Sequence, residues 1–402
     1  CGEKILWLSP TNHRFPLLQW ERWTYLNIMI SAGEASGDVY GAYLAEKLIQ
    51  LSPGVQLSGI GGAKMKDSGV EILKDPTTLS AIGFTEVLAN LSLHRKVFVQ
   101  AVEELDRISP DCLVLIDFPE FNMRLAKRAA GKGIPGVYLF PPTAWAWRRG
   151  RAKALAGIGT TIASVFPLEA DTYRKAGADV RFVGHPLLDL VSPAEPDEKE
   201  STRRELGLDA EEVIGLLPGS RDLEIKTLLP TMLQAAALIK QAKPGAGLLL
   251  PLSHTVSRDL VREHVRKSGL PVRIISGSTH QCMAASDVLM VASGTATMEA
   301  TIVGTPMVVL YKTSTPTYLL ARLLVEIPHI SWPNILMEKR IVPELLQDEA
   351  DPEAVARLVL LVLENPSLSS EVRKNLAEAR GKLGSPGALM RTAELILEVA
   401  RR

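Results

Sequence analysis

The sequence contains few cysteines, no excess of charge of either sign and no long apolar run, and each of these absences excludes a class of protein. Its 402 residues include three cysteines, Cys1, Cys112 and Cys282, far apart in the chain. Such spacing excludes a disulfide framework and predicts a reducing, cytoplasmic compartment. The 45 basic residues balance the 45 acidic residues. No global field attracts nucleic acid, so we expect no nucleic-acid partner.

Membrane spans and several common enzyme motifs are absent as well. No uncharged run approaches the roughly 20 residues that a bilayer span requires. There is no Walker A motif, no Gly-x-Ser-x-Gly elbow and no Cys/His cluster with metal spacing. The glycines of Gly59-Ile-Gly-Gly62 lack the third glycine of a dinucleotide fingerprint, because Lys64 stands in its place. We therefore expect neither a metal nor a cofactor.

Short apolar runs that alternate with helical stretches fill most of the chain. This pattern is typical of parallel sheets covered by helices on both faces. We predict an α/β protein with two tandem doubly wound, Rossmann-like domains, a cleft between them and C-terminal helices. The predicted strands span residues 26–32, 56–60, 112–116 and 136–140, and then 213–217, 247–251, 272–275, 288–291 and 307–310.

Composition suggests where these domains begin and end. Residues 1–25 hold three of the six tryptophans without a clear period. They are predicted to be an atypical extension, with an interfacial membrane segment as the alternative. The first domain is predicted over 26–190 and the second over 191–350, where the polar start of the second, residues 191–200, is predicted to be a linker. Residues 351–402 are predicted to form helices with one apolar face.

The strand that ends at Val291 continues into a small-residue turn and a helix, a pattern that suggests a diphosphate cradle. Ser293 and Gly294 leave room for a ligand beside the backbone. The N–H groups at the start of the helix, beginning with Thr295, attract an anion. Glu299, about one and a half turns along, is placed to reach ribose hydroxyls. The alternative is that Ser293 is an ordinary N-cap and Glu299 a solvated acid.

Asp117 stands at the mouth of an otherwise fully apolar strand. Burial raises the pKa of such a carboxylate, which suits a general base. A turn residue whose side chain bonds the backbone beside Pro119 is an equally good interpretation. Glu120 and Asn122 are able to support either role.

Three further loops follow predicted strands. In Pro218-Gly-Ser-Arg221, Gly219 and Ser220 form a turn, and the Arg221 guanidinium suits a phosphate, although a surface arginine that caps a helix is the ordinary alternative. The residues Glu34, Ser36, Gly37 and Asp38 precede a helix and suit a sugar or phosphate, with a helix capped by Ser36 as an equal alternative. His185 is a weaker candidate for a site residue. The apolar stretch 79–91 is predicted to be a core helix, or a lipid contact if its apolar face is exposed.

Taken together, these motifs resemble the lipid-A-disaccharide synthase family, inverting glycosyltransferases of the two-domain GT-B architecture. Single motifs are weak, but their number and order over about residues 27–347 are specific. The resemblance rests on Gly33-Glu-Ala-Ser-Gly-Asp38, Gly59-Ile-Gly-Gly62, Ile116-Asp-Phe-Pro-Glu-Phe-Asn122, Trp145-Ala-Trp-Arg148, Gly184-His-Pro186, Leu217-Pro-Gly-Ser-Arg221, Ala292-Ser-Gly-Thr-Ala296, Pro333-Asn334 and Glu344-Leu-Leu-Gln347. Two features depart from the family: the first 25 residues, and Phe140-Pro-Pro where the family usually has Ser-Pro.

The resemblance implies a reaction and a set of partners. It implies metal-independent transfer of 2,3-diacylglucosamine from UDP-2,3-diacylglucosamine to 2,3-diacylglucosamine 1-phosphate, with a β-1,6 bond formed and UDP released. It also implies peripheral association with the inner face of the inner membrane, and leaves a homodimer open. Asp117 would be the base and Arg221 would stabilise the leaving group. The donor residues would be Gly219, Ser220, Ser293, Gly294, Thr295, Glu299, Asn334 and Gln347 of the second domain, and the acceptor residues Glu34, Ser36, Gly37, Asp38, Asn122, Arg148 and His185.

Two other functions remain open at this stage. One is a different UDP-sugar enzyme of the same architecture, an N-acetylglucosaminyltransferase or a UDP-N-acetylglucosamine epimerase. The other is a non-catalytic nucleotide-sugar binding protein. A requirement for an acylated acceptor would distinguish the implied reaction from that of another UDP-sugar enzyme. Any turnover would distinguish it from a binding protein, which has none.

Overall fold

A computed structural model of the protein describes residues 26–75, 91–145, 150–314, 318 and 328–402. The predictions made for residues 1–25, for 79–90 and for Arg148 lie outside this part of the chain. The described chain divides into two compact units. The first comprises the residues up to Pro142 together with Leu155–Ala163 and Leu389–Arg402, and the second comprises Thr143–Ala154 and Ser164–Ala388.

The first sheet has seven strands in the order β3-β2-β1-β4-β5-β6-β7. Its central strands pair in parallel, and all five residues of β4 are buried. Such burial explains why β4 is apolar at every position. The strands are β1 (Asn27–Ala32), β2 (Gln56–Ile60), β3 (Glu71–Lys74), β4 (Cys112–Ile116), β5 (Gly136–Leu139), β6 (Thr161–Ser164) and β7 (Val180–Phe182). The helices along this part of the chain are α1 (Ala35–Leu51), α2 (Ala63–Asp67), α4 (Leu91–Ile108), α5 (Pro119–Ala130), α6 (Gly150–Ile158) and α7 (Pro167–Lys175).

The second sheet has six strands, all parallel, in the order β10-β9-β8-β11-β12-β13. The strands are β8 (Val213–Leu217), β9 (Gly247–Leu252), β10 (Val272–Ser276), β11 (Val288–Ala292), β12 (Met307–Tyr311) and β13 (Glu344–Leu346). The helices are α8 (Leu187–Leu190), α9 (Pro196–Glu205), α10 (Asp222–Ala242), α11 (Arg258–Ser268), α12 (Thr279–Ala285), α13 (Thr295–Val303), α15 (Trp332–Met337), η3 (Gln347–Glu349), α16 (Pro352–Glu364), α17 (Pro366–Gly381) and α18 (Ala388–Ala400).

Both sheets are doubly wound, as predicted. In each, the first strand of the series lies in the middle of the sheet, and the chain builds outward on one side and then on the other. The order therefore reverses between β1 and β4 in the first sheet and between β8 and β11 in the second. Ligands of such sheets bind outside the carboxyl ends of the strands at this switch point. The residues that follow these four strands are thus the ones to inspect for function.

Two local expectations need correction. Helix α1 begins at Ala35 and its N-cap is Glu34, so the alternative of Ser36 as the cap is wrong. Gly37 lies in the first turn of this helix, where a Cβ would lie 3.3 Å from the Cβ of Ala32. The polar stretch predicted as a linker covers half of helix α9, which begins at Pro196, since proline fits the first turn of a helix.

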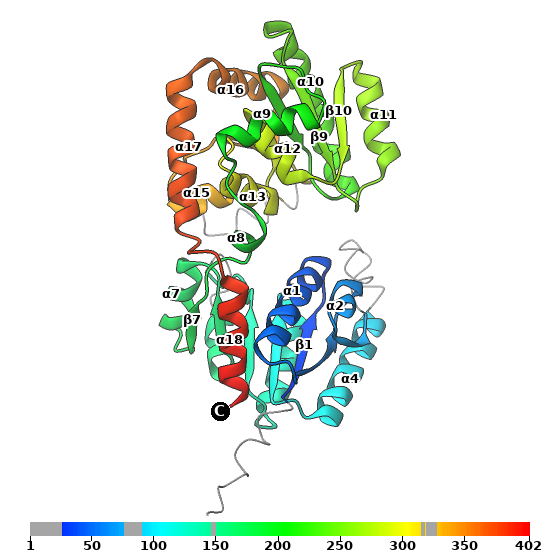
Figure 1. Ribbon diagram of the computed structural model, residues 1–402, viewed down its shortest axis with the longest axis vertical. Coiled ribbons are helices and arrows are strands. Elements are labelled where there is room, and N and C mark those ends of the chain that lie inside the picture. Colours follow the sequence, from blue (N-terminus) through cyan, green and yellow to red (C-terminus); the bar gives the residue numbers. More distant parts are fainter. Residues whose placement is uncertain (1–25, 76–90, 146–149, 315–317, 319–327) are drawn as a thin grey trace, which may run out of the picture. The chain divides into compact units, whose positions relative to one another are not determined.

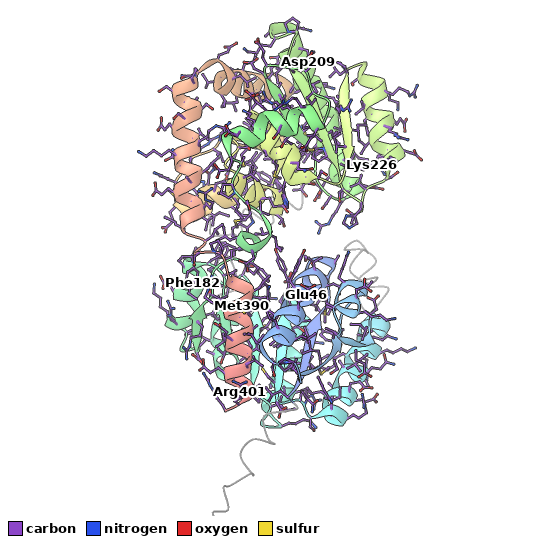
Figure 2. All side chains as sticks on the ribbon, viewed as in Figure 1. Glu46, Phe182, Asp209, Lys226, Met390 and Arg401 are labelled. Atoms are coloured by element: carbon purple, nitrogen blue, oxygen red, sulfur yellow. The ribbon has the colours of Figure 1, made fainter. Side chains whose placement is uncertain are left out.

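The end of the chain is helical, as predicted. The last helix, α18, lies beside the strands of the first unit, and α16 and α17 belong to the second (Figure 1). Charged side chains such as Glu46, Asp209 and Lys226 lie at the surface (Figure 2). Within the described residues, every helix is too short or too polar to cross a bilayer.

Candidate functional site

Asp117 follows β4 in a strained turn. Asp117 and Phe118 both adopt positive φ angles, 49° and 50°, before Pro119 starts helix α5. Two consecutive non-glycine residues in this region cost stability, and such strain often marks functional positions. The turn is held through its backbone. The carbonyl oxygen of Asp117 accepts hydrogen bonds from Asn122 Nδ2 at 2.7 Å and from Tyr138 Oη at 2.9 Å.

The Asp117 carboxyl is partly buried beside a second acid. Burial, followed by the negative charge of Glu34, raises its pKa to about 6. Glu34 follows β1 and Asp117 follows β4, so the two acids lie at the switch point of the first sheet. The close approach of the two loops requires a glycine at position 33, because a Cβ there would lie 2.2 Å from the Phe118 ring. A carboxyl with this pKa is able to accept a proton near neutral pH.

Two residues predicted to contact the acceptor are structural. Asn122 is fully buried; its Oδ1 accepts from Ser31 Oγ at 2.7 Å, and its Nδ2 donates to three backbone carbonyls. Asp38 is buried as well and accepts from the backbone N–H groups of Gly62, Lys64 and Met65, at the start of α2. Both side chains have their polar atoms bonded within the protein and hold the loops in place, and their contact with the acceptor stays a prediction.

A cavity of about 660 Å³ lies within the second unit, at the carboxyl ends of β8, β9, β10 and β11. Its volume falls in the ordinary range of small-molecule sites. Seven of the predicted catalytic and donor residues line it together: Gly219, Ser220, Arg221, Ser293, Gly294, Thr295 and Glu299. The strand-end rule thus brings these sequence candidates into one site.

The turn after β8 depends on its glycine. Gly219 has a φ of 118°, and a Cβ there would lie 2.1 Å from Glu224 Oε2. That oxygen accepts from the N–H groups of Ser220 at 2.8 Å and Arg221 at 3.2 Å, so Glu224 occupies the N-terminus of α10. The Arg221 side chain is 80% exposed and its Nη1 lies 3.5 Å from Glu224 Oε1. An exposed ion pair of this kind is weak, so the guanidinium is available to an incoming anion.

The turn after β11 leaves a helix N-terminus uncapped. Gly294 is the N-cap of α13, with φ 157° and ψ −156°, a conformation that essentially only glycine adopts. It has no side chain to bond the first N–H groups of α13, and Thr295 and Ala296 line the cavity. The alternative of Ser293 as the N-cap is therefore wrong. An uncapped helix start attracts anions through its N–H groups and its dipole.

Glu299 lies further along α13 and also lines the cavity. Its Oε1 lies 3.3 Å from Nε2 of His280 on α12. A carboxylate near a phosphate-binding turn is the group that commonly holds ribose hydroxyls in doubly wound domains.

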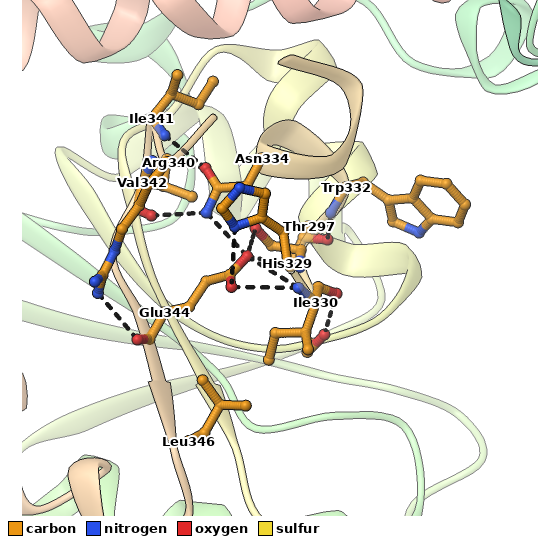
Figure 3. A network of polar contacts seen from close by, with 12 residues as sticks. Thr297, His329, Ile330, Trp332, Asn334, Arg340, Ile341, Val342, Glu344 and Leu346 are labelled. Atoms are coloured by element: carbon orange, nitrogen blue, oxygen red, sulfur yellow. Dashed lines mark hydrogen bonds and ion pairs between the residues drawn. The ribbon is translucent and has the colours of Figure 1, made fainter. Parts of the chain in front are cut away.

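A buried polar network supports the turn after β11 (Figure 3). Its centre is Glu344 on β13, whose Oε1 accepts from Ser331 N at 2.8 Å, Ser331 Oγ at 2.5 Å and Asn334 Nδ2 at 2.9 Å. Ser293 Oγ donates to the carbonyl of Ile330 at 2.8 Å, which ties the turn after β11 to the same segment. Burial with satisfied hydrogen bonds makes such a network rigid.

The remaining predicted residues lie outside the cavity. Asn334 is fully buried, and its Oδ1 accepts from the N–H groups of Ile341 and Val342, so it supports the structure here, and its contact with the donor stays a prediction. Gln347 pairs through its side-chain amide with the backbone of Thr313. His185 is 4% exposed, and burial lowers its pKa to about 3, which keeps it neutral.

Sequence reasoning missed several polar residues of the cavity. Ser253 and His254 follow β9, and Ser276 is the last residue of β10. Arg258, at the start of α11, donates to Ser276 Oγ at 2.5 Å. The strand-end rule predicts three of them, and the segment of Ser276 contains a glycine turn as well, because Gly277 has a φ of 72° and also lines the cavity. In the described part of the chain, no group of three or more His, Cys, Asp or Glu side chains is arranged to hold a metal ion.

Comparison with known proteins identifies the family. The family model described as lipid-A-disaccharide synthetase matches residues 28–397. The lipid-A-disaccharide synthase of Syntrophus aciditrophicus is 38% identical over 377 residues, which cover 93% of this chain and 98% of that protein. The enzyme of the same name from Geobacter metallireducens is 39% identical over 373 residues, 92% of this chain and 97% of that protein.

Solved structures show the same fold in more distant proteins. A putative UDP-N-acetylglucosamine 2-epimerase from Listeria monocytogenes is 14% identical with a TM-score of 0.64, covering 94% of this chain and 96% of that chain. The UDP-GlcNAc 2-epimerase of Neisseria meningitidis, bound to UDP-GlcNAc, is 13% identical with a TM-score of 0.61, covering 93% and 100%. At these identities the likeness concerns architecture alone. The full-length sequence matches decide the assignment: this chain belongs to the lipid-A-disaccharide synthase family.

Proposed function

We propose that this glycosyltransferase moves 2,3-diacylglucosamine from its UDP derivative to the 6-hydroxyl of 2,3-diacylglucosamine 1-phosphate, forming a β-1,6 bond. The observation that carries the mechanism is the Asp117 carboxyl, strained, partly buried and with its pKa raised to about 6. Family membership supports the class of substrate, because the relatives are named for the synthesis of the lipid A disaccharide.

The reaction in this proposal is a single displacement with inversion. The acceptor hydroxyl gives its proton to the Asp117 carboxylate as its oxygen attacks C1 of the donor sugar. The bond from C1 to the diphosphate oxygen breaks, and the electron pair leaves with UDP. Glu34 raises the basicity of Asp117, since its charge disfavours a second negative charge nearby.

The cavity of the second unit takes UDP in this scheme. The N-terminus of α13 and Arg221 stabilise the charge that develops on the leaving diphosphate. Arg258 adds a second cation to the same cavity, and Glu299 accepts from the ribose hydroxyls. These roles need no metal, because fixed cations and N–H groups provide the stabilisation.

We propose peripheral contact with the inner face of the inner membrane as a further part of this function. Acyl chains hold both substrates at a lipid surface. A depression of about 560 Å³ on the first unit is lined by Phe98 and the basic residues Arg124, Lys127, Arg128 and Lys132, which suits anionic headgroups. Replacement of Arg124 and Lys127 by glutamate should lower co-sedimentation with anionic vesicles, and unchanged co-sedimentation would contradict this surface.

The oligomeric state, with a homodimer as the first option, is tested by light scattering on the same protein.

A transfer assay tests the reaction. Purified protein is incubated with UDP-2,3-diacylglucosamine and the acceptor, and the product is identified by mass. The proposal predicts a disaccharide phosphate and an equal amount of UDP. Conversion of UDP-N-acetylglucosamine without an acceptor would instead indicate an epimerase. UDP binding without turnover would indicate a binding protein.

A further inference from the structure

The second unit contains another cavity, which has aromatic walls. It measures about 290 Å³, near the lower end of the range for small-molecule sites. The ring of Trp332 stacks on Phe166 with centroids 4.6 Å apart and planes 13° apart, and lies 6.0 Å from the ring of Trp145. Leu168 and Leu336 add aliphatic surface. We refer to this space as the aromatic cavity.

The aromatic cavity is apolar inside with charged side chains around it. Asp171 and Glu338 are exposed, and Lys382 donates from Nζ to the carbonyl of Leu336 at 2.9 Å, so its ammonium is held at the wall. Leu168 is 42% exposed, unusually for a large aliphatic side chain in this protein. A concave, apolar surface with a charged border fits a ligand with a hydrocarbon part and a polar end.

Trp145 provides an independent indication of a ligand. Its indole Nε1 is buried and has no hydrogen-bond partner among the residues that the structure describes. Buried donors in native proteins nearly always have a partner, so an unsatisfied one requires an explanation. A ligand that carries an acceptor oxygen next to its hydrocarbon chain, such as an acyl carbonyl or a chain hydroxyl, would satisfy this N–H group. A plain hydrocarbon would not.

The aromatic cavity is connected through helix α13 to the cavity of about 660 Å³ that takes UDP in the proposed function. We call that larger space the nucleotide cavity. The N–H group of Trp332 donates to Thr297 Oγ1 at 3.3 Å, and Thr297 Oγ1 donates to the carbonyl of Gly294 at 2.8 Å. Gly294 lines the nucleotide cavity. Figure 3 shows Thr297 and Trp332 next to each other, with the indole turned away from Glu344. Trp332, which forms a wall of the aromatic cavity, is thus two hydrogen bonds away from Gly294 in the turn after β11.

We infer that the aromatic cavity receives one acyl chain of the donor sugar, with the Trp145 N–H group bound to an oxygen of that chain. This inference rests on the proposed function for the identity of the donor. It goes further, because it assigns donor-chain selection to the second unit and to named residues. The hydrogen-bond connection to the nucleotide cavity favours a chain of the donor over a chain of the acceptor.

The test compares two donors, one with ordinary acyl chains and one whose chains are each shortened by four methylenes. Each buried methylene contributes roughly fourfold to binding, so the wild-type kcat/KM should favour the long-chain donor by about tenfold or more. Leu168→Trp places an indole at the cavity and should reduce this ratio to about 1–2. Trp145→Phe keeps the ring and removes the donor, and should lower kcat/KM by roughly three- to tenfold for both donors.

Leu361→Trp is the matched control, because Leu361 is a 49% exposed leucine on α16, outside both cavities. It should keep the wild-type ratio. Calorimetry with UDP checks that the nucleotide cavity of each variant is intact. If Leu168→Trp retains activity and the full wild-type ratio, the acyl chain binds elsewhere and the inference is wrong.

Calorimetric binding of the same two donors separates this inference from the proposed function. If no transfer occurs, the proposed function fails. Wild-type protein that still binds the long-chain donor more tightly, with the preference lost in Leu168→Trp, would then support the acyl site alone. Equal affinities of wild-type protein for the two donors would overturn the acyl site, whether or not transfer occurs.

Discussion

The switch points of the two sheets share a topology and differ in chemistry. After β1 and β4, the first sheet places two carboxyl groups, Glu34 and Asp117, close enough that one raises the pKa of the other. After β8 and β11, the second sheet places two glycine turns, an arginine and an uncapped helix start. In the proposed function, the same fold thus serves proton transfer at one site and an anion at the other.

The two sites also differ in how their backbones are held. The turns at Gly219 and Gly294 use glycine to reach conformations that other residues avoid. The turn at Asp117 and Phe118 uses residues with side chains, and hydrogen bonds from Asn122 and Tyr138 hold it. Glycine costs little strain but carries no reactive group. A catalytic side chain at a tight turn requires a structure that compensates for the strain.

The largest expected effect is that of Asp117→Asn, which keeps the shape of the side chain and removes the base. Turnover should fall by about 10²-fold or more, the usual contribution of a general base. Glu103→Gln, at an exposed position on α4, is the matched control and should retain full activity. Near-normal turnover of a well-folded Asp117→Asn protein would show that another group takes the proton, and Glu34 would be examined next.

Arg221→Ala should have the next largest effect, at the switch point of the second sheet. Loss of a charge-assisted contact to phosphate should weaken UDP binding by roughly 10- to 100-fold and should lower turnover as well. Arg262→Ala removes an exposed arginine of α11 that does not line the cavity, and it serves as the control. Equal UDP affinities of the two variants would remove Arg221 from the site.

Glu299→Ala should weaken UDP binding by roughly tenfold, because hydrogen bonds to an ionised acceptor contribute more than neutral ones. The effect should disappear for a nucleotide analogue without ribose hydroxyls, which gives the variant a control within the same experiment. If calorimetry shows wild-type affinity for UDP, Glu299 does not contact the nucleotide.

Glu34→Gln should give the smallest effect, a change in pH dependence. The base must be ionised, so the wild-type kcat/KM should rise with pH through about 6, the pKa of Asp117. Removal of the Glu34 charge lowers that pKa, so the rise should move to lower pH, with little change above pH 7. A rise that stays in place, measured over the acid range, would show that Glu34 does not act on the base.

The architecture was largely predictable from the sequence, because apolar strands and glycine turns are local signals. Strands β4 and β8 were predicted with the observed bounds, and the family, the enzyme class and the two-sheet fold are confirmed. The short strands β3, β6, β7 and β13 were missed; each has only three or four residues, too few for a period to show.

The roles of buried polar residues were not predictable. Asp38, Asn122 and Asn334 stand in motifs that resemble ligand contacts, yet the structure uses all three to bond backbone groups. Asp38 bonds Gly62, and Asn122 bonds Ser31, at separations of 24 and 91 residues. Such partners are set by tertiary packing, which a motif does not reveal. Conversely, His254 and Arg258 were overlooked because they lie beside no glycine turn.

The most direct test of this division of roles is UDP affinity, measured by calorimetry on Asp117→Asn and Arg221→Ala side by side. We predict that Asp117→Asn, although nearly inactive, binds UDP within about twofold of the wild-type protein, while Arg221→Ala binds it at least about tenfold more weakly. If Asp117→Asn loses as much UDP affinity as Arg221→Ala, the carboxyl acts on the nucleotide and the assignment of the two sites to different chemistry is wrong.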